Sequence, residues 1–263
     1  MKYVVVTGAY GGMGYAAVKA LKEQGYFVFA LDRAVRESEE SVMPIQVDLT
    51  DSDAILSAYD KVKSVTDELY AIVHFAGMYN LDSLVEISEE SFTKIFNINV
   101  FACYRVNKVF LPLLKSGSRI VITTSELAPL DPLPFTGIYA ITKSALDKYA
   151  YSLRMEVQLL GIKVSVLRPG AVDTGMLGVS IAALDRFCES TELYACNAKR
   201  FKHIVESVEA KNVKAEKIGN KTLKILNAKR PKMVYKINRN PLLLLLNILP
   251  KRLATYIIKL ILK

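Results

Sequence analysis

The hydrophobic pattern of this chain alternates between short apolar runs and longer stretches with helical periodicity. Runs that are apolar throughout predict strands buried on both faces, as in a parallel sheet covered by helices. The predicted strands are residues 2–6, 26–31, 42–47, 69–77, 119–124 and 162–167, and residues 232–237 are compatible with an edge strand. The predicted helices are residues 13–24, 52–65, 91–114 and 137–160. This alternation predicts a single α/β domain built on a doubly wound parallel sheet.

The pattern changes near residue 175. Residues 176–230 look helical and apolar enough to cover a lipophilic substrate, so we expect a helical substrate lid there. Helices packed against the core or against a second subunit would show the same pattern. We expect the α/β domain with its lid to span residues 1–240, and residues 241–263 to form a C-terminal extension.

The C-terminal extension is amphipathic and basic. A membrane-spanning helix needs about 20 uninterrupted apolar residues. Asn247, Pro250 and three basic residues interrupt this stretch, so no transmembrane span is expected. The extension is suited to peripheral contact with an anionic bilayer. Packing onto the parent domain or across a dimer is the alternative.

Charge is unevenly distributed along the chain. The formal net charge is +9, but residues 1–198 carry 18 Lys and Arg against 23 Asp and Glu, whereas residues 199–263 carry 17 against 3. This asymmetry indicates an acidic partner for the C-terminal quarter, either a phospholipid surface or an acidic protein, unless the basic face is only solvated. No interleaving of aromatic and basic residues favours nucleic-acid binding.

The cysteine and histidine residues indicate the cellular compartment and whether a metal site is expected. Three cysteines are an odd number without a CxxC pair, which favours a reducing, cytoplasmic compartment. A core strand already occupies residues 2–6, so no signal peptide is expected before it. His74 and His203 lie far apart in the chain without neighbouring cysteines, so no metal site is expected.

A glycine-rich turn, TGAYGGMG, joins the first predicted strand to the first predicted helix. Gly8, Gly12 and Gly14 allow the backbone to approach a pyrophosphate, whose charge is met by the N–H groups and the dipole of the helix N-terminus. A purely structural turn is not expected to need three glycines. In this context the turn predicts the dinucleotide site of a Rossmann-type fold.

Acidic residues at strand ends bear on the choice of dinucleotide. Asp32 follows the second strand, where a carboxylate can bond both hydroxyls of the adenosine ribose and would repel a 2′-phosphate. Arg33 beside it could act in the opposite sense, but we favour NAD over NADP. Asp48 follows the third strand and is placed to accept from the adenine amino group. Asp32 and Asp48 could instead be turn residues.

Tyr139 and Lys143 are the candidate proton donor and its neighbour. They lie four residues apart on a predicted helix and therefore share a face. A tyrosine titrates at about 10, and a nearby ammonium lowers that pKa by favouring the phenolate. Ser125 can hydrogen-bond a substrate oxygen, and Asn99 could anchor a water near Lys143. Tyr-x-x-x-Lys occurs four times here, but only this pair follows a strand ending in TTS at the carboxyl edge of the sheet, where doubly wound folds bind ligands.

The ordered set of motifs resembles the short-chain dehydrogenase/reductase family, densely over residues 1–180. TGAYGGMG matches its glycine turn, FNINV the helix with its Asn, VITTS the strand with its Ser, YAITK its Tyr–Lys pair, and RPGAVDT its Pro–Gly segment. The C-terminal extension is similar to those of hydroxysteroid and retinol dehydrogenases in this family. The resemblance implies a homodimer or homotetramer.

The resemblance also implies roles for individual residues. Tyr139 would be the acid/base, Lys143 would also hold the nicotinamide ribose, and Thr174 would bond the nicotinamide carboxamide. The implied catalytic set is Asn99, Ser125, Tyr139 and Lys143. The implied cofactor-binding set is Thr7, Gly8, Gly12, Met13, Gly14, Asp32, Arg33, Asp48, Ala76, Gly77, Tyr139, Lys143, Pro169, Gly170, Val172 and Thr174.

Two segments depart from the family pattern or add to it. The usual Asn-Asn-Ala-Gly after the fourth strand reads HFAG here, so we expect altered packing, with His74 structural and not catalytic. Pro129, Pro132 and Pro134 lie between Ser125 and Tyr139 and are expected to stiffen one wall of the substrate cleft.

We therefore expect an NAD(P)-dependent oxidoreductase that transfers a hydride between the nicotinamide and a hydroxyl or carbonyl carbon. Its substrate would be a small-molecule alcohol or ketone of lipophilic character. One alternative is an NADPH-dependent 3-ketoacyl carrier-protein reductase, whose basic region would dock the acidic carrier. The other is a dinucleotide-sensing protein without turnover.

Overall fold

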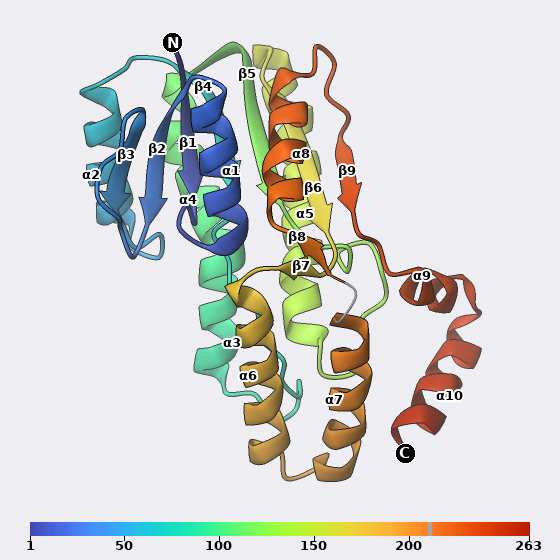
Figure 1. Ribbon diagram of the computed structural model, residues 1–263. Helices are drawn as coiled ribbons and strands as arrows, with labels where there is room; N and C mark the ends of the chain where they lie inside the picture. Colours follow the sequence, from blue (N-terminus) through green and yellow to red (C-terminus); the bar gives the residue numbers. More distant parts are fainter. Residues whose placement is uncertain (210–211) are drawn as a thin grey trace.

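A seven-stranded parallel sheet forms the centre of the molecule (Figure 1). The computed structural model describes residues 1–209 and 212–263, and for residues 175–181 and 207–209 it describes the backbone alone. The sheet order is β3-β2-β1-β4-β5-β6-β9, so the chain winds outward in both directions from β1 and the predicted Rossmann-type fold is confirmed. The strands are β1 (Lys2–Thr7), β2 (Tyr26–Asp32), β3 (Val42–Gln46), β4 (Leu69–His74), β5 (Leu114–Thr123), β6 (Lys163–Pro169) and β9 (Val234–Ile237).

Helices cover both faces of the sheet. α2 (Ser52–Lys63), α4 (Ala102–Phe110) and α5 (Gly137–Val157) pack on one face, and α1 (Gly12–Glu23) and α8 (Glu216–Asn227) pack on the other. Alternate residues of β1 divide between the two cores: Val5 belongs to the first, and Val4 and Val6 to the second. Burial of both faces is the reason why the strands are apolar throughout.

One predicted helix, residues 91–114, is interrupted in the structure. α3 (Glu89–Phe96) runs into a π-helical turn (Asn97–Phe101), which continues as α4. β5 then begins at Leu114, ahead of the predicted start, and its pairing with β4 shifts register before Arg119. The polar residues between Leu114 and Arg119 concealed this first part of the strand from the hydrophobic pattern.

The segment predicted as a lid, residues 176–230, divides between two environments and lies partly outside the described residues. α8 belongs to the sheet layer, because Ile218, Ile225 and Leu226 are buried in the core that it shares with α1. An amphipathic period is the same for a lid helix and for a helix that covers a sheet. Only α6 (Gly175–Ser190) and α7 (Ala195–Glu209) extend away from the sheet.

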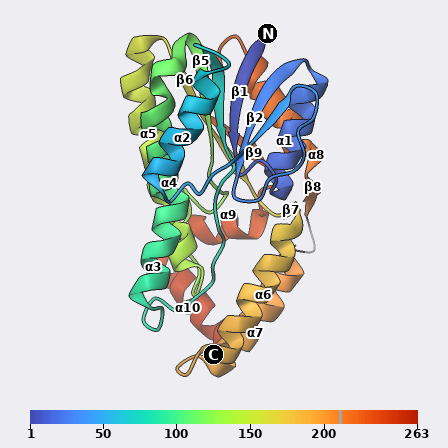
Figure 2. The same ribbon diagram turned by 90° about the vertical axis from the view of Figure 1, so that its left-hand side faces the viewer.

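Four helices gather beyond the carboxyl ends of the strands: α6, α7, α9 (Pro241–Ile248) and α10 (Lys251–Leu262) (Figures 1 and 2). The short strands β7 (Val172–Asp173) and β8 (Val213–Lys214) pair next to them. Leu262 of α10 is buried in a small third core with Phe201 of α7, and Asn197 donates to the Leu262 carbonyl at 2.6 Å. The C-terminal extension therefore packs onto the parent domain. No helix among the described residues is long and apolar enough to cross a membrane.

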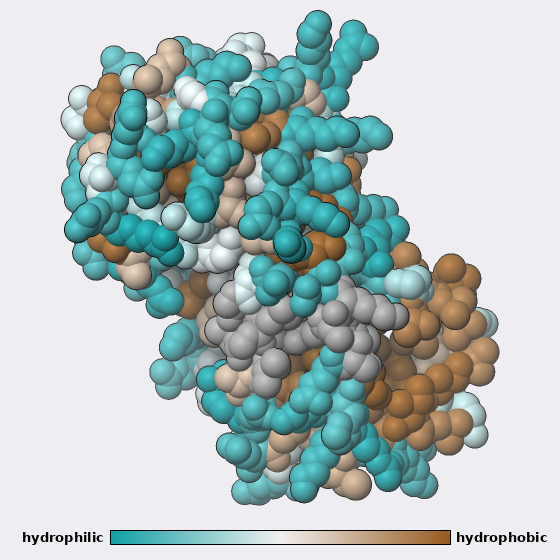
Figure 3. All heavy atoms as spheres, in the orientation of Figure 1, coloured by the Kyte–Doolittle hydropathy of each residue, from teal (hydrophilic) through white to brown (hydrophobic). Residues whose placement is uncertain are grey.

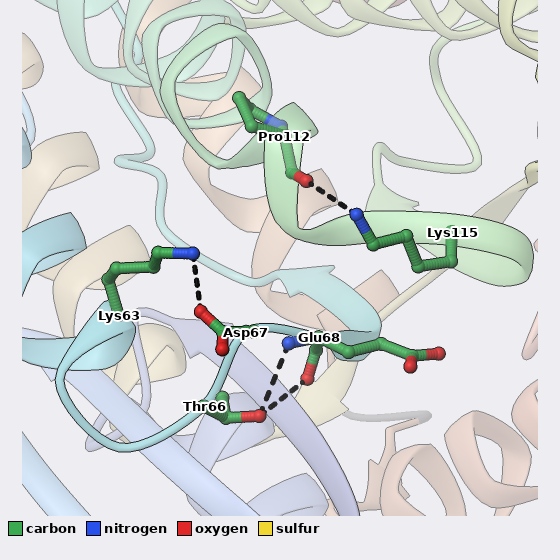
Figure 4. Close-up of polar contacts among 6 residues, drawn as sticks. All are labelled: Lys63, Thr66, Asp67, Glu68, Pro112 and Lys115. Atoms are coloured by element: carbon green, nitrogen blue, oxygen red, sulfur yellow. Dashed lines mark hydrogen bonds and ion pairs between the residues drawn. The ribbon is translucent and has the colours of Figure 1, made fainter.

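Local turn contacts stabilise the opposite end of the sheet, where strands β4 and β5 begin (Figure 4). Lys63 at the end of α2 pairs with Asp67. The Thr66 hydroxyl donates to the Glu68 carbonyl at 3.0 Å and accepts from the Glu68 N–H at 3.3 Å. Such exposed contacts contribute at most about 1 kcal/mol each, and they lie at the end of the sheet where doubly wound folds do not bind ligands.

Candidate active site

An apolar cavity of about 470 Å³ lies beyond the carboxyl ends of β4, β5 and β6. Ser125, Tyr139 and Lys143 line it together, so the structure brings three of the four predicted catalytic side chains to one space. Helices α7, α9 and α10 close its other side. Their lining residues are Phe201, Ile204, Val205, Leu242, Leu243, Leu246, Ile257, Ile258, Ile261 and Leu262.

Tyr139 lies on α5 and is half-buried in the cavity that it shares with Ser125. The Ser125 hydroxyl forms a side-chain hydrogen bond with the Tyr139 oxygen, and the ring of Tyr79 stands edge-on at 4.7 Å between centroids. Burial raises the pKa of Tyr139 to about 12, and the bond from Ser125 opposes this only in part. Because the pKa is raised, Tyr139 stays a neutral phenol at physiological pH, and this is the form that donates a proton.

Lys143 is almost completely buried, one helical turn from Tyr139. Its Nζ lies 5.5 Å from the centre of the Tyr139 ring. Burial lowers the pKa of Lys143 to about 8. The predicted lowering of the Tyr139 pKa by this ammonium is not found in the protein alone, because loss of solvation dominates at both groups. Among the described residues, the ammonium makes one long hydrogen bond, 3.5 Å to the Thr123 carbonyl, which leaves donors for a ligand.

Asn99 lies at the centre of the π-helical turn, a feature that is frequent at functional sites. Its Oδ1 accepts from the Met78 N–H at 2.7 Å, and its Nδ2 donates to the Met78 carbonyl and to the Thr142 hydroxyl, both at 3.0 Å. The amide thus fixes the backbone after β4. A Cβ at Gly77 would lie 3.3 Å from Asn99 Oδ1 and 3.4 Å from Lys143 Nζ, so the glycine keeps the space between them open. A water anchored by Asn99 stays a prediction.

The three glycines of the turn are each required by packing within the protein. Gly8 has a φ of 63°, and a Cβ there would lie 2.6 Å from the Ala76 nitrogen. A Cβ at Gly14 would lie 1.9 Å from the Gly8 carbonyl oxygen, and one at Gly12 would lie 2.4 Å from Thr174 Cβ. Our expectation that a structural turn would not need three glycines is therefore wrong. Gly12 also brings Thr174, at the start of α6, against the turn.

A second cavity, of about 370 Å³, lies along this turn. It adjoins the first cavity, because five residues line both: Met13, Phe75, Gly77, Met78 and Thr174. Two adjoining cavities, one beside a helix N-terminus and one beside Tyr139, fit an elongated dinucleotide.

Most of the predicted cofactor residues line one or both cavities. Thr7 is the exception: it is fully buried, lines neither cavity, and accepts from the Ala76 N–H at 3.4 Å through its hydroxyl. Gly8, Gly12, Met13, Gly14, Asp32, Arg33, Asp48, Ala76, Gly77 and Thr174 line the second cavity, and Pro169, Gly170 and Val172 line the first.

Asp32 and Asp48 both have structural bonds as well as access to the second cavity. Asp32 accepts from the Tyr10 N–H at 2.9 Å, which ties the end of β2 to the glycine turn. Asp48 accepts from the Thr50 N–H at 2.8 Å and from its hydroxyl at 2.7 Å, and these bonds hold the pKa of Asp48 below its usual value. The cap of α2 is Asp51, so Asp48 forms a turn just before the helix.

His74 has the structural environment that we expected for it. Its Nε2 lies 2.9 Å from Asn107 Oδ1, and Asn107 in turn donates to the Tyr149 hydroxyl at 3.1 Å. Burial lowers the pKa of His74 to about 4, so the imidazole is neutral at physiological pH. Phe75 reaches both cavities as an apolar wall in place of an asparagine.

Glu126 is a residue of the cavity that the sequence analysis missed. Its Oε2 accepts from the Asn240 N–H at 2.7 Å, and its own N–H donates to the Pro169 carbonyl at 2.8 Å. It therefore joins the loop after β5 to the start of α9. The one available sign was an acidic residue placed directly after Ser125 in an otherwise apolar stretch.

Comparison with known proteins agrees with this fold. A family model for short chain dehydrogenases matches residues 2–184, so the chain belongs to the short-chain dehydrogenase/reductase family, whose members are NAD(P)-dependent oxidoreductases. It is 27% identical over 235 residues to 3-ketodihydrosphingosine reductase of Bacteroides thetaiotaomicron, covering 89% of this chain and 87% of that protein.

Two further similarities cover different shares of the chain. Estradiol 17-beta-dehydrogenase 2 of Mus musculus is 33% identical over 189 residues, which are 67% of this chain but only 50% of that protein. A short chain dehydrogenase of Burkholderia cenocepacia, solved in complex with NADP, has the same fold with a TM-score of 0.74, at 19% identity and 98% coverage of both chains.

The buried His74 predicts a pH dependence of stability. Its folded pKa of about 4 lies below the unfolded value of about 6.5, so protonation favours the unfolded chain. A contribution of about 3 kcal/mol is complete above pH of about 6.5 and is lost as the pH falls towards about 4. In urea titrations, His74→Gln should give a flatter dependence of the unfolding free energy on pH over this range. His203→Gln, at an exposed position, should behave as the wild type, and equal slopes in all three proteins would contradict the prediction.

Proposed function

We propose that this protein interconverts a lipophilic secondary alcohol and its ketone, with the hydride passing between the substrate carbon and a nicotinamide dinucleotide. The main support is that Ser125, Tyr139 and Lys143 meet at an apolar cavity adjoining the glycine turn. The cavity walls favour an apolar substrate over a sugar or a small acid. The names of two relatives, a ketodihydrosphingosine reductase and an estradiol dehydrogenase, are those of proteins that act on such lipids.

In this proposal each polar side chain of the cavity has one task. Ser125 orients the substrate oxygen by a hydrogen bond and also bonds Tyr139. Tyr139 gives a proton to that oxygen during reduction and takes one during oxidation. Lys143 holds a ribose hydroxyl with its remaining donors, and Asn99 fixes the backbone at Met78 that borders both cavities. The bound cofactor supplies the hydride and, when oxidised, a positive charge that favours the phenolate.

We propose NAD as the preferred cofactor. Asp32 lines the second cavity at the end of β2, and its carboxylate would repel the extra phosphate of NADP. Arg33 beside it lines the same cavity and is the residue that would favour NADP. Both dinucleotides occur with this family, so the balance of these two side chains decides between them.

We further propose a homodimer formed by α4 and α5. Both helices cover the same face of the sheet, and each leaves large apolar side chains exposed on its outer side. A shared apolar face on two adjacent helices is typical of a symmetric dimer interface. The exposed side chains are those of Phe101 and Tyr104 near the start of α4, and of Ile141, Tyr151 and Met155 on α5.

We also propose that the protein is cytoplasmic and that it binds the surface of an anionic bilayer through α9 and α10. Their outer side is a continuous apolar area in Figure 3, and Leu245 and Ile248 are 58% and 79% exposed. Lys251, Arg252 and Lys259 lie on the same helices, and no acidic residue follows Glu216 in the chain. Apolar side chains flanked by basic ones fit the interface of an anionic membrane.

Removal of the Tyr139 hydroxyl tests the catalytic assignment. Tyr139→Phe should lower kcat with secondary alcohols by about 100-fold or more, because no group then exchanges the proton. Binding of NADH, followed by its fluorescence, should be nearly unchanged. Tyr59→Phe, on α2 and outside the lining of both cavities, is the control and should keep full activity. Unchanged turnover in Tyr139→Phe would rule out this role, and cofactor binding without turnover in the wild type would favour a dinucleotide sensor.

Neutralising Asp32 tests the cofactor preference. Asp32→Asn keeps an acceptor for the Tyr10 N–H but removes the charge, so the ratio of kcat/KM with NADPH to that with NADH should rise by about tenfold or more. Asp53→Asn, in the first turn of α2, should leave the ratio unchanged. A wild-type preference for NADPH would instead favour the carrier-protein reductase.

Acidic substitutions on α9 test membrane binding. The wild type should sediment with phosphatidylglycerol vesicles at low salt and much less with phosphatidylcholine vesicles. The double variant Leu245→Glu/Ile248→Glu should reduce that binding by about tenfold or more, because two apolar anchors are replaced by like charges. Neither residue lines the cavity. Leu159→Glu, at an 83% exposed position outside α9 and α10, should bind normally. No sedimentation of the wild type with either vesicle would refute the proposal.

A further inference from the structure

Glu126 places a carboxyl group in a largely apolar cavity. Among the described residues that line the 470 Å³ cavity, Glu126 is the only one with a carboxyl group and Lys143 the only one with an amino group in its side chain. Burial raises the pKa of Glu126, with the Asn240 N–H and the more distant charge of Arg239 acting in the opposite direction. A partly buried carboxylate is costly unless a donor or a cation meets it.

Only one of the two carboxylate oxygens has a donor within the described part of the chain. Oε2 accepts from the Asn240 N–H at 2.7 Å. Oε1 lies close to Gly170, where a Cβ would come within 2.7 Å of it, and Gly170 itself lines the cavity. No described basic side chain forms an ion pair with this carboxylate. Oε1 is therefore available to a group inside the cavity.

The bond to Asn240 does not explain why this residue is charged. A glutamine would accept the same N–H through its amide oxygen, without the cost of placing a carboxylate in a cavity whose lining includes Leu127, Leu243 and Leu246. The charge of Arg239 favours the carboxylate, but Arg239 forms no ion pair with it, so no described cation contacts Glu126 directly. A cationic substrate group would account for the carboxylate, because a charge-assisted hydrogen bond between ammonium and carboxylate is stronger than a neutral one.

We propose that Glu126 binds the protonated amine of an amphipathic substrate, so that the natural substrate is a long-chain amino alcohol or amino ketone. Ser125 and Glu126 line the same cavity, so an amine held by Oε1 would share that space with the oxygen that Ser125 orients. The apolar walls from α7, α9 and α10 then enclose the hydrocarbon chain. This inference rests on the proposed oxidoreductase function and adds to it the chemical class of the substrate.

The experiment measures the turnover of three alcohols by the wild type and by two variants. The substrates are a long-chain secondary alcohol, the same alcohol with an amino group on the adjacent carbon, and the same alcohol with a hydroxyl group there. The variant is Glu126→Gln, which keeps the bond to Asn240. The control is Glu86→Gln, a carboxylate outside the cavity lining that also accepts backbone N–H groups, at Glu192 and Leu193.

The wild type should favour the amino alcohol, and Glu126→Gln should lower kcat/KM for that substrate by about tenfold or more, mainly through KM. Its kcat/KM for the plain alcohol should stay within about twofold of the wild-type value, and Glu86→Gln should leave all three substrates unaffected. An equal loss with the hydroxyl-bearing alcohol would show recognition of a neutral donor and overturn the proposal. A ratio of amino to plain alcohol unchanged by Glu126→Gln would also overturn it. Absence of turnover with every alcohol would instead refute the proposed oxidoreductase function.

Discussion

The chemistry of this protein depends on an ammonium that is kept out of water. Lys143 is 5% exposed, pairs with no carboxylate of the described residues, and has a pKa lowered to about 8 by burial. It is therefore still charged at neutral pH but poorly solvated, so it gains from any acceptor that a ligand brings. The same burial raises the pKa of Tyr139 to about 12. Without a ligand, the phenol keeps its proton, and the two groups are ready for a cofactor but do not activate each other.

Close backbone approach is what brings these groups together at the carboxyl edge of the sheet. Gly77 leaves room between Asn99 and Lys143, and Gly12 lets Thr174 contact the glycine turn. The π-helical turn displaces Asn99 from the regular helical course and directs its amide to the backbone of Met78. Gly77, Met78 and Thr174 line both cavities, so these contacts lie where the two cavities adjoin. A side chain larger than glycine would press on Thr174 from position 12, and on Asn99 and Lys143 from position 77.

The sequence predicted most of the fold, because a strand buried on both faces has an unmistakable apolar run. It predicted β1, β2 and β6 almost to the residue, but it missed the start of β5, where Lys115 and Ser118 interrupt that run. Periodicity could not separate α8, which covers the sheet, from the lid helices that precede it, since all are amphipathic. The spacing of Tyr139 and Lys143 indicated a shared helix face. The direction of the Tyr139 pKa shift depends instead on three-dimensional burial, which spacing does not contain.

The hydrophobic pattern did not determine whether the apolar residues of the C-terminal extension pack on the domain or face outward. Leu243, Leu246 and Ile258 wall the cavity, while Leu245 and Ile248 on α9 point to solvent. An amphipathic helix has one apolar side, but α9 is apolar on both, so packing on the domain and contact with a bilayer do not exclude each other. Asn240 is the N-cap of α9: its side chain accepts from the Leu242 N–H, and its own N–H donates to Glu126. A shift of α9 away from the domain would break the hydrogen bond from the Asn240 N–H to Glu126, the residue next to Ser125, and also the bond from the Asp131 N–H to Asn247 on α9.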